Sequence, residues 1–309
     1  MAELVIVGAG PIGTWVAEAA VADGVIERIS AVVDPDEQAR HELVAATGAP
    51  GYASTVELPV ARSGDVALVA FASAAEKVAP VILRLVSAGY HVVTTCEGLA
   101  WAPRHLWDAM HTSARSDGKS IIVTGANPGF SMDRLPLLLA GATRDITLIH
   151  VERDMDTSLR RPSLVAKSGR GLTIDQFADG VSRGRVGHKG LDSSARLIAR
   201  GLEWAYRDVS LSVEPILDGD QVIGAFHRVH LNGGEGRSIR FDHRMAWGLT
   251  PEVDRITIEG NPRIVSEIDG GYPVDDGTAA QVVNAIRRVA TLKPGFYRPT
   301  DLPLRYGVS

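Results

Sequence analysis

Three glycines near the N-terminus have the spacing of a phosphate-binding turn. Gly8, Gly10 and Gly13 follow the apolar run 4–7 and precede an alanine-rich helical stretch at 15–22. In such a turn the first glycine permits the tight bend, the second lets the backbone approach a pyrophosphate, and the third lets the helix pack against the strand. The free N–H groups at the start of the helix then face the phosphates. The predicted dinucleotide-binding residues of this turn are Gly8, Gly10, Pro11, Ile12 and Gly13.

An acidic residue ends the next apolar stretch, as a ribose-binding carboxylate would. Asp34 closes the predicted strand 28–34, where its side chain could accept hydrogen bonds from the adenosine ribose hydroxyls. The same charge repels a 2′-phosphate, so NAD is favoured over NADP. Asp34 and Asp36 also precede a predicted helix, which leaves an N-cap role open for Asp34. Arg40 could pair with a 2′-phosphate, so NADP stays possible.

Small and polar residues follow the third and fourth predicted strands. Ligands of an open α/β sheet lie outside the carboxyl ends of its strands. Ala72 and Ser73 are small enough for the diphosphate and the nicotinamide ribose to pass, although a turn with Ser73 as a helix N-cap is the alternative. Thr95 and Cys96 end the fourth strand, beside the expected nicotinamide ring. Because Cys96 has no evident activating neighbour, we favour a small buried residue over a nucleophile.

Glu97 is the residue in this region whose type fits acid–base chemistry. It comes directly after an apolar strand and before Gly98. A carboxylate there could bind an ammonium group or exchange protons with an amine. The alternative is an N-cap or a solvated turn residue.

The fifth predicted strand leads into a proline- and glycine-containing loop. Asn127, Pro128 and Gly129 form a rigid turn, and the Asn127 amide offers donors and an acceptor. Such a loop could frame the nicotinamide and a substrate. It could also be an interdomain hinge that begins a helix over 135–139, and the two roles are compatible.

The histidines show no metal-binding pattern, so no metal site is predicted. The scattered positions lack HExxH or paired-carboxylate spacing. His227 and His230 lie in one strand pattern at an odd separation, so they should face opposite sides of a sheet.

The secondary-structure elements that must position these residues follow two different sequence patterns. Up to about residue 133, short apolar strands alternate with helices, which predicts a Rossmann-type doubly wound parallel sheet. The predicted strands are 3–7, 28–34, 66–71, 91–95 and 120–124, and the predicted helices are 11–23, 36–47, 74–88 and 103–116.

From Asp145 the strands alternate polar and apolar residues, which predicts a second α+β domain with an open, mainly antiparallel sheet. The predicted strands are 145–155, 207–217, 221–232, 237–247, 253–260 and 262–268, with helices at 174–182 and 191–203. A helical pattern returns at Gly277 and should fold back on the first domain. We therefore expect a dinucleotide-binding domain over 1–133 with 272–309, and a substrate-binding and dimerisation domain over 134–271.

Composition excludes several classes of partner. The chain has 309 residues, 22% of them charged, and a formal net charge of −5 without a basic run, so we expect no nucleic-acid or anionic-membrane partner. Its apolar runs are too short to span a bilayer, and the N-terminus lacks the features of a signal peptide. One cysteine excludes an internal disulfide framework. These features fit a cytoplasmic enzyme.

Several segments, taken together, resemble a known family. They are Gly8–Gly13, Thr95-Cys-Glu-Gly-Leu99, Ala126-Asn-Pro-Gly-Phe-Ser-Met-Asp133, Arg153–Arg161, Lys167–Thr173, Gly187-His-Lys-Gly190 and Gly277–Ile286. This order resembles the 2,4-diaminopentanoate dehydrogenase family and its relatives, the native amine dehydrogenases, which share the dihydrodipicolinate-reductase-like fold. The Lys/His run and the Ser-Gly-Thr motif of dihydrodipicolinate reductase itself are absent, which disfavours a role in lysine biosynthesis.

The resemblance implies an NAD(P)-dependent enzyme that deaminates an amine, or aminates a ketone or aldehyde with ammonia. By the same resemblance Glu97 matches the acid that handles ammonia and the imine nitrogen, and Asn127 to Gly129 match the loop beside the nicotinamide. Phe130 and Thr278 match pocket positions, and a homodimer through the open sheet is implied. Gly98 stands where the family commonly has a second acid, and 161–166 departs from the family pattern. These departures bear on the substrate more than on the reaction.

The leading hypothesis is an amine dehydrogenase acting on a small amine or carbonyl substrate with ammonia. One alternative is an NAD(P)H-dependent reductase of a cyclic imine or carbonyl in a biosynthetic pathway. Another, from a different class, is a non-catalytic dinucleotide sensor.

Overall fold

The computed structural model describes residues 2–303, and the chain divides into two compact units. Unit 1 is made of Met1–Phe130 and Val274–Ser309, and unit 2 of Ser131–Pro273. These divisions lie three and two residues from the domain boundaries expected from the sequence. Each unit has its own sheet and its own apolar core.

Unit 1 is built on a parallel sheet with the strand order β13-β6-β5-β4-β1-β2-β3. The strands are β1 (Leu4–Val7), β2 (Ile29–Val33), β3 (Gly51–Tyr52), β4 (Val66–Val69), β5 (His91–Thr94), β6 (Ser120–Val123) and β13 (Gly295–Tyr297). This confirms the predicted Rossmann-type sheet. The edge strands β3 and β13 were not predicted, because two or three residues are too short to show a periodic pattern.

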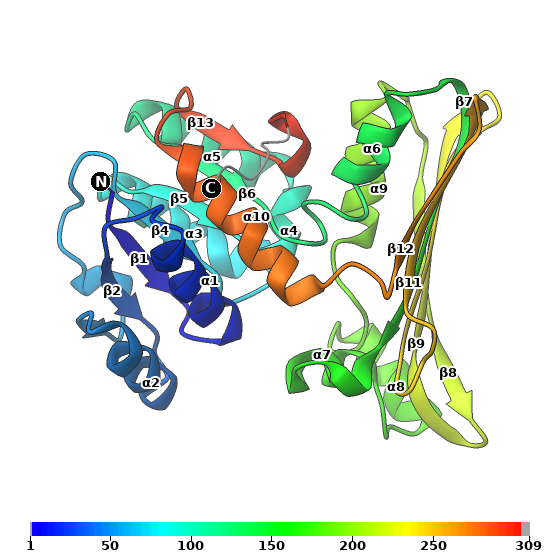
Figure 1. Cartoon of the computed structure of the whole chain (residues 1–309), viewed down its shortest axis with the longest axis horizontal. Helices are drawn as coiled ribbons and strands as arrows, with labels where there is room; N and C mark the ends of the chain where they lie inside the picture. The colour runs from blue at the N-terminus through cyan, green and yellow to red at the C-terminus, as the bar shows by residue number, and fades with distance from the viewer. Residues whose placement is uncertain (1, 304–309) are drawn as a thin grey trace. The chain divides into compact units, whose positions relative to one another are not determined.

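The central strands of unit 1 are buried along their whole length, as expected of a sheet covered by helices on both faces. The helices are α1 (Pro11–Ala22), α2 (Glu37–Thr47), α3 (Ala75–Ser87), α4 (Glu97–Ala100), α5 (Arg104–Ser116) and α10 (Val274–Val289), with 3-10 turns η1 (Thr55–Glu57) and η3 (Pro299–Asp301). Helix α10 returns from the far end of the chain and packs beside α1 (Figure 1). Two parts of the sequence therefore close one core.

Unit 2 is built on a sheet with the strand order β12-β11-β7-β10-β9-β8. The strands are β7 (Arg144–Asp156), β8 (Val209–Asp218), β9 (Gln221–Gly234), β10 (Arg237–Ala246), β11 (Val253–Asn261) and β12 (Ile264–Asp269). Neighbouring strands are antiparallel except for β7 and β10, which are parallel. The predicted open, mainly antiparallel sheet is confirmed, with this parallel pair as an addition.

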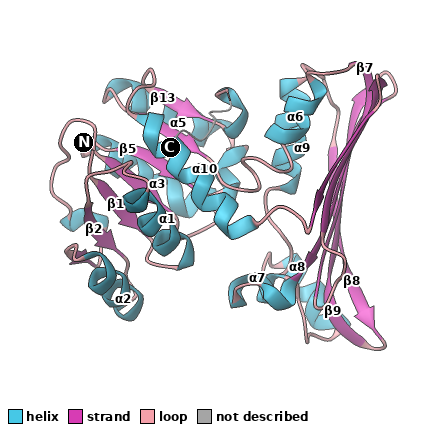
Figure 2. Ribbon diagram, in the orientation of Figure 1, coloured by secondary structure: helices cyan, strands magenta, loops and turns pink. Residues whose placement is uncertain are grey.

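The helices of unit 2 lie on one side of its sheet (Figure 2). They are α6 (Arg134–Ala140), α7 (Pro162–Lys167), α8 (Ile174–Ser182) and α9 (Leu191–Gly201), and η2 (Thr157–Leu159) follows β7. Strand β7 alternates between buried and half-buried residues from Ile149 to Met155. One face of the sheet is therefore core, and the other carries charged side chains. Among the described residues, no helix has the length and apolar character needed to cross a membrane.

Candidate dinucleotide and acid–base site

The glycine turn between β1 and α1 has the geometry that a pyrophosphate requires. Gly8 has a φ of +110°, and a Cβ atom there would lie 2.9 Å from the Ala70 backbone. A Cβ on Gly13 would lie 2.1 Å from the Gly8 carbonyl oxygen, so the helix packs directly on the turn. Gly10, by contrast, would place a Cβ with no atom within 4 Å. The backbone at Gly10 is thus open on its outer side, which fits the close approach of a dinucleotide phosphate at a helix N-terminus.

The Asp34 carboxylate ties this turn to the end of β2. Its Oδ2 atom accepts a hydrogen bond from the Ala9 N–H at 2.8 Å, and its Oδ1 atom accepts one from the Asp36 N–H at 2.9 Å. Asp36 is the residue that caps α2, because its side chain accepts from the Ala39 N–H. The N-cap alternative for Asp34 is therefore wrong. Each Asp34 oxygen retains acceptor capacity that ribose hydroxyls could use.

Arg40 lies beside the same strand end. Its Nη1 atom donates to the Asp34 carbonyl oxygen at 2.5 Å. A guanidinium and a carboxylate thus flank the place where the 2′ position of an adenosine ribose is expected, and the carboxylate is the group tied to the glycine turn.

The register of unit 1 brings the strand ends into one row. Val7 is paired with Val33 on one side and with Val69 on the other, Val69 with Thr94, and Thr94 with Val123. Because all these strands are parallel, the residues that follow them meet at one edge of the sheet. That edge contains the glycine turn, Asp34, and the segments 70–73, 95–97 and 124–129. The structure therefore brings together the dinucleotide and acid–base residues predicted from the sequence.

The loop after β4 lies against the residue that follows Glu97. The Gly98 N–H donates a hydrogen bond to the Ser73 carbonyl oxygen at 3.0 Å, and a Cβ on Gly98 would lie only 2.7 Å from that oxygen. Ser73 is not a helix cap, since α3 has Ala74 at its N-cap without a side-chain bond. The glycine that replaces the second acid of the family pattern is thus required by the close contact between these two loops.

Cys96 is an inert, buried thiol. Its side chain is 1% exposed, and it occupies the N-cap of the short helix α4. Burial, with a further contribution from Glu97, raises the pKa of Cys96 to about 12 despite opposing hydrogen bonds from the Leu99 and Gly98 backbone. The thiolate needed for a nucleophile is therefore not formed near neutral pH.

Glu97 is the first residue of α4 and follows the carboxyl end of β5. The N-cap is Cys96, so the N-cap alternative for Glu97 is wrong. Its side chain is partly buried, and its charge acts on the Cys96 thiol. A partly buried carboxylate at the edge that also holds the glycine turn can bind a cationic nitrogen and exchange its proton.

Helix α10 holds the Asn127–Gly129 loop in place through a hydrogen bond to the loop backbone. The peptide between Asn127 and Pro128 is cis, and Gly129 has a φ of +146° with no room for a Cβ beside Gly125. The Thr278 hydroxyl donates to the Val274 carbonyl at 2.7 Å and accepts from the Ala126 N–H at 3.3 Å.

Thr278 therefore supports the loop through its hydroxyl, in addition to the pocket role implied by the resemblance. Phe130 ends this loop with a half-buried side chain and donates its N–H to the Ala126 carbonyl.

Sequence reasoning missed a buried polar cluster on the helix-covered face of the unit 2 sheet. Arg153 on β7 is 4% exposed, and its Nε lies 3.4 Å from Oδ1 of Asp254 on β11. The Arg153 guanidinium also donates to the Ser131 hydroxyl and the Tyr272 carbonyl. On β10, His243 is 1% exposed, and its Nε2 atom has no hydrogen-bond partner. The two-residue repeat of a strand could have indicated these positions, since Arg153 and His243 alternate with outward-facing residues in the same way as the buried apolar residues of their strands.

Among the described residues, no group of three or more His, Cys, Asp or Glu side chains could hold a metal ion. His227 is buried and His230 exposed, as their odd separation predicted. Arg160 is ion-paired with Glu252, with Nη2 and Oε1 separated by 2.5 Å and both side chains less than a fifth exposed.

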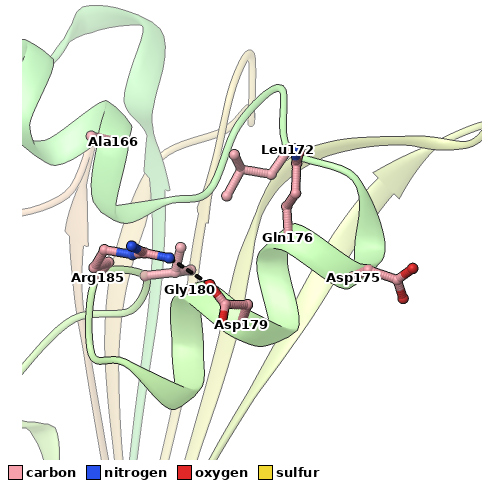
Figure 3. Close-up of a pocket in the computed structure, with 8 residues that line it drawn as sticks. Ala166, Leu172, Asp175, Gln176, Asp179, Gly180 and Arg185 are labelled. Atoms are coloured by element: carbon pink, nitrogen blue, oxygen red, sulfur yellow. Dashed lines mark hydrogen bonds and ion pairs between the residues drawn. The ribbon is translucent and has the colours of Figure 1, made fainter.

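Unit 2 also carries an open hollow of about 590 Å³ beside α8 (Figure 3). Its rim holds the ion pair between Arg185 and Asp179, with Nη2 and Oδ2 separated by 2.5 Å. None of the predicted site residues lines it. The lining residues are Ala166, Leu172, Asp175, Gln176, Asp179, Gly180, Arg185 and Val186.

Comparison with known proteins finds one family and one curated relative that are similar to this chain. Residues 130–235 match the family described as 2,4-diaminopentanoate dehydrogenase C-terminal domain. The 2,4-diaminopentanoate dehydrogenase of Acetoanaerobium sticklandii is 27% identical over 267 residues, which cover 79% of this chain and 75% of that protein.

Solved structures show the same fold. The amine dehydrogenase from Mycobacterium smegmatis matches with a TM-score of 0.85 at 19% identity, covering 99% of this chain and 97% of that one. GenD2 from gentamicin A biosynthesis, solved with NAD, matches with a TM-score of 0.65 at 16% identity over 97% and 89% of the two chains. This chain therefore shares the fold of these two proteins. The resemblance to the 2,4-diaminopentanoate dehydrogenase family is confirmed.

Proposed function

We propose that this chain is an NAD(P)-dependent amine dehydrogenase. The observation that carries the proposal is the position of Glu97, a partly buried carboxylate at the strand-end edge that also holds the glycine turn. The curated relative, named for its action on 2,4-diaminopentanoate, supports the same reaction class. In the deaminating direction an alkylammonium, NAD⁺ and water give a carbonyl, ammonium, NADH and a proton.

In this proposal, residues of the glycine turn and Asp34 bind the dinucleotide, and Glu97 transfers the proton. The open backbone at Gly10 and the first turn of α1 would hold the pyrophosphate, and the Asp34 carboxylate would hold the adenosine ribose. When bound, the nicotinamide supplies or accepts the hydride. Glu97 would hold the substrate nitrogen as a cation and take or return its proton, which favours the iminium, the better hydride acceptor.

We infer that NAD is preferred over NADP. Asp34 is the group aimed at the ribose end of the site, and its charge opposes a 2′-phosphate. Arg40 offers a positive charge nearby, but its guanidinium already donates to the Asp34 carbonyl. Michaelis constants for NADH and NADPH measured side by side would test this preference.

The test of the proposed function is the Glu97→Gln variant. It keeps the size of the side chain and removes its charge and proton-accepting capacity. The probes are 2,4-diaminopentanoate with NAD⁺, and ammonium with NADH and a panel of pentan-2-one, cyclohexanone, isobutyraldehyde and 4-oxopentanoate. We expect turnover to fall by about a hundredfold or more, within the range for loss of an acid–base group, while NADH binding is kept.

Glu76→Gln is the matched control, because Glu76 is an exposed carboxylate on the neighbouring helix α3. Near-normal turnover in Glu97→Gln would overturn the assignment. Turnover of carbonyls or cyclic imines without ammonium would indicate a reductase, and tight NADH binding without any turnover would indicate a sensor.

We further propose a homodimer formed through the uncovered face of the unit 2 sheet. That face carries charges of both signs in neighbouring positions, including the pairs His150–Asp242 and Arg244–Asp154. Such a surface can be complementary to a second copy of itself. A solution mass near twice 32.9 kDa would support the proposal, and a monomer at micromolar concentration would overturn it.

A further inference from the structure

One large apolar side chain is exposed at the strand-end edge of unit 1. Phe71, two residues beyond β4, is 42% exposed, whereas the other five phenylalanines of the chain are buried or half-buried. Its neighbours Ala70, Ala72 and Ser73 are small. Single exposed apolar residues are common on protein surfaces, so it is the position of Phe71 that makes its exposure informative.

The backbone places Phe71 against the glycine turn. The Ala70 N–H donates to the Val7 carbonyl oxygen at 2.8 Å, so the hydrogen bonding between β4 and β1 continues to the residue before Phe71. A Cβ atom on the first glycine of the turn would lie 3.0 Å from the Phe71 nitrogen. On the other side of the turn, the Asp34 carboxylate accepts the Ala9 N–H at 2.8 Å. Phe71 and Asp34 therefore flank the same turn from the two strands beside β1.

The loop after β4 joins the two ends of the candidate site. Its start, at Phe71, contacts the glycine turn. Two residues later, the Ser73 carbonyl oxygen accepts the N–H of Gly98, the residue after Glu97. In the proposed function the nicotinamide lies at the Glu97 end, because the hydride passes to a substrate whose nitrogen Glu97 holds. Phe71 is at the opposite end of this loop, the end where an adenosine is expected.

We propose that Phe71 binds the adenine base of the dinucleotide. Its ring offers a planar apolar surface to the base, next to the ribose held by Asp34. Stacking of a base on an aromatic ring uses the π-face of the base and requires no charge from the protein. Phe71 thus adds one large apolar side chain to a site otherwise made of backbone and small residues. The inference rests on the proposed function for the dinucleotide, and it concerns cofactor binding rather than the chemistry at Glu97.

The experiment compares Phe71→Ala, which removes the ring, with Phe71→Tyr, which keeps it. Val21→Ala is the matched control, because Val21 is 52% exposed at the opposite end of α1 from the glycine turn. Dissociation constants are measured for NADH and for ADP-ribose, which contains the adenosine and the pyrophosphate but no nicotinamide. Turnover is followed with the best substrate of the panel above, and chemical denaturation reports the stability of each variant.

In Phe71→Ala we expect the dissociation constants of NADH and ADP-ribose to rise by the same factor, about tenfold, the effect of one lost base–aromatic stack. Phe71→Tyr and Val21→Ala should stay within about twofold of the wild type for both ligands. At saturating NADH, kcat should be unchanged while the KM for NADH rises, because the adenine contact is the same in the ground state and the transition state. The unfolding free energy should change little, since Phe71 is exposed.

Contact between the ring and the base is read directly by NMR. Nuclear Overhauser effects are expected between the adenine H2 or H8 protons of bound ADP-ribose and the ring protons of Phe71. The Phe71 signals are assigned as those that disappear in Phe71→Leu.

Three results would overturn the proposal: unchanged ADP-ribose affinity in Phe71→Ala, a loss of affinity confined to NADH, which would place the ring at the nicotinamide half, or no Overhauser effect between adenine and Phe71. Near-normal turnover in Glu97→Gln would overturn the proposed function and leave this inference standing, because binding of ADP-ribose requires no turnover. A wild-type chain that binds neither NADH nor ADP-ribose would overturn both.

Discussion

The candidate dinucleotide site of unit 1 is made of backbone and small residues, whereas the polar cluster of unit 2 is made of large charged and aromatic side chains. At the glycine turn, the backbone of Gly10 is open to an approaching ligand, and the backbone of Gly13 is packed against the turn. In unit 2, Arg153, His227 and His243 come from three different strands and are each less than 5% exposed.

This difference determines how each region responds to change. A site of backbone atoms is shaped by where the strands end, so most side chains around it can vary as long as the turn keeps its form. A cluster of buried polar side chains depends on every member, because removal of one leaves its partners unpaired in a medium of low polarity. A substitution that leaves the turn intact should therefore act on binding in unit 1, whereas the loss of one member of the cluster should act on stability in unit 2.

The largest effect is expected for Arg153→Met. The substitution keeps most of the side-chain volume but leaves Asp254 as a buried carboxylate without its ion-pair partner, and Oδ1 of Asp254 has no hydrogen bond to replace it. Loss of one partner of a buried pair costs about 3–5 kcal/mol of unfolding free energy. Chemical denaturation monitored by circular dichroism measures this loss.

Arg255→Met is the matched control for Arg153→Met. Arg255 forms an ion pair with Glu267 in which both side chains are nearly half exposed, and such pairs contribute about 1 kcal/mol or less. A further Asp254→Asn change should restore part of the stability lost in Arg153→Met. Equal, small losses in Arg153→Met and Arg255→Met would contradict the contrast between the buried cluster and the surface.

The sequence carried enough information to predict that the candidate site residues of unit 1 lie at one edge of the sheet, because its signals are local. Gly8, Asp34 and Glu97 each stand directly after an apolar strand, and parallel pairing then brings strand ends to one edge. The unit 2 cluster could not be assembled in this way, since it needs the register between β7, β10 and β9, and the pairing of β7 with β10 joins residues about 90 positions apart. The three cap alternatives fail narrowly, since Asp34, Ser73 and Glu97 each lie within two residues of the actual N-cap residue.

Acidification is expected to destabilise both units, because each holds a buried neutral histidine. Burial lowers the pKa of His91 in unit 1 and of His227 in unit 2 from 6.5 to about 4. Between these values the unfolded chain binds protons that the folded chain does not, so the unfolding free energy falls as the pH is lowered through this window. The loss is complete below about pH 4 and amounts to about 3 kcal/mol per histidine.

Denaturation curves collected between about pH 7 and pH 4.5 test this expectation in three variants. His91→Gln and His227→Gln should each reduce the slope of stability against pH by up to about 1.4 kcal/mol per pH unit. His105→Gln, at an exposed position on α5, should leave the slope unchanged. A wild-type chain whose stability is constant or rises on acidification would contradict the neutral state of both rings.

Two glycines of the same turn should separate folding from cofactor binding. Gly13→Ala places a Cβ 2.1 Å from the Gly8 carbonyl oxygen, so the backbone must move, and a loss of about 2 kcal/mol is expected. Gly10→Ala meets no atom within 4 Å and should leave stability almost unchanged. If a pyrophosphate passes Gly10, the added methyl group lowers NADH affinity by about tenfold, a cost of about 1.4 kcal/mol.

Denaturation curves should show the larger loss of unfolding free energy in Gly13→Ala. NADH titration by fluorescence should show a loss of affinity in Gly10→Ala while its fold remains stable. Unchanged NADH affinity in Gly10→Ala would remove the main support for a dinucleotide at this turn.

The smallest effect is expected at Asp36, two residues beyond Asp34. Asp36→Ala removes the cap of α2 on an exposed surface and should cost about 1 kcal/mol of unfolding free energy, with NADH affinity unchanged. Asp34→Ala removes the carboxylate that holds the Ala9 N–H and is expected to hold the ribose, so it should weaken NADH binding and improve NADPH relative to NADH. Parallel titrations with both dinucleotides would show the difference, and an equal loss of NADH affinity in the two variants would mean that α2, rather than the Asp34 carboxylate, shapes the ribose end of the site.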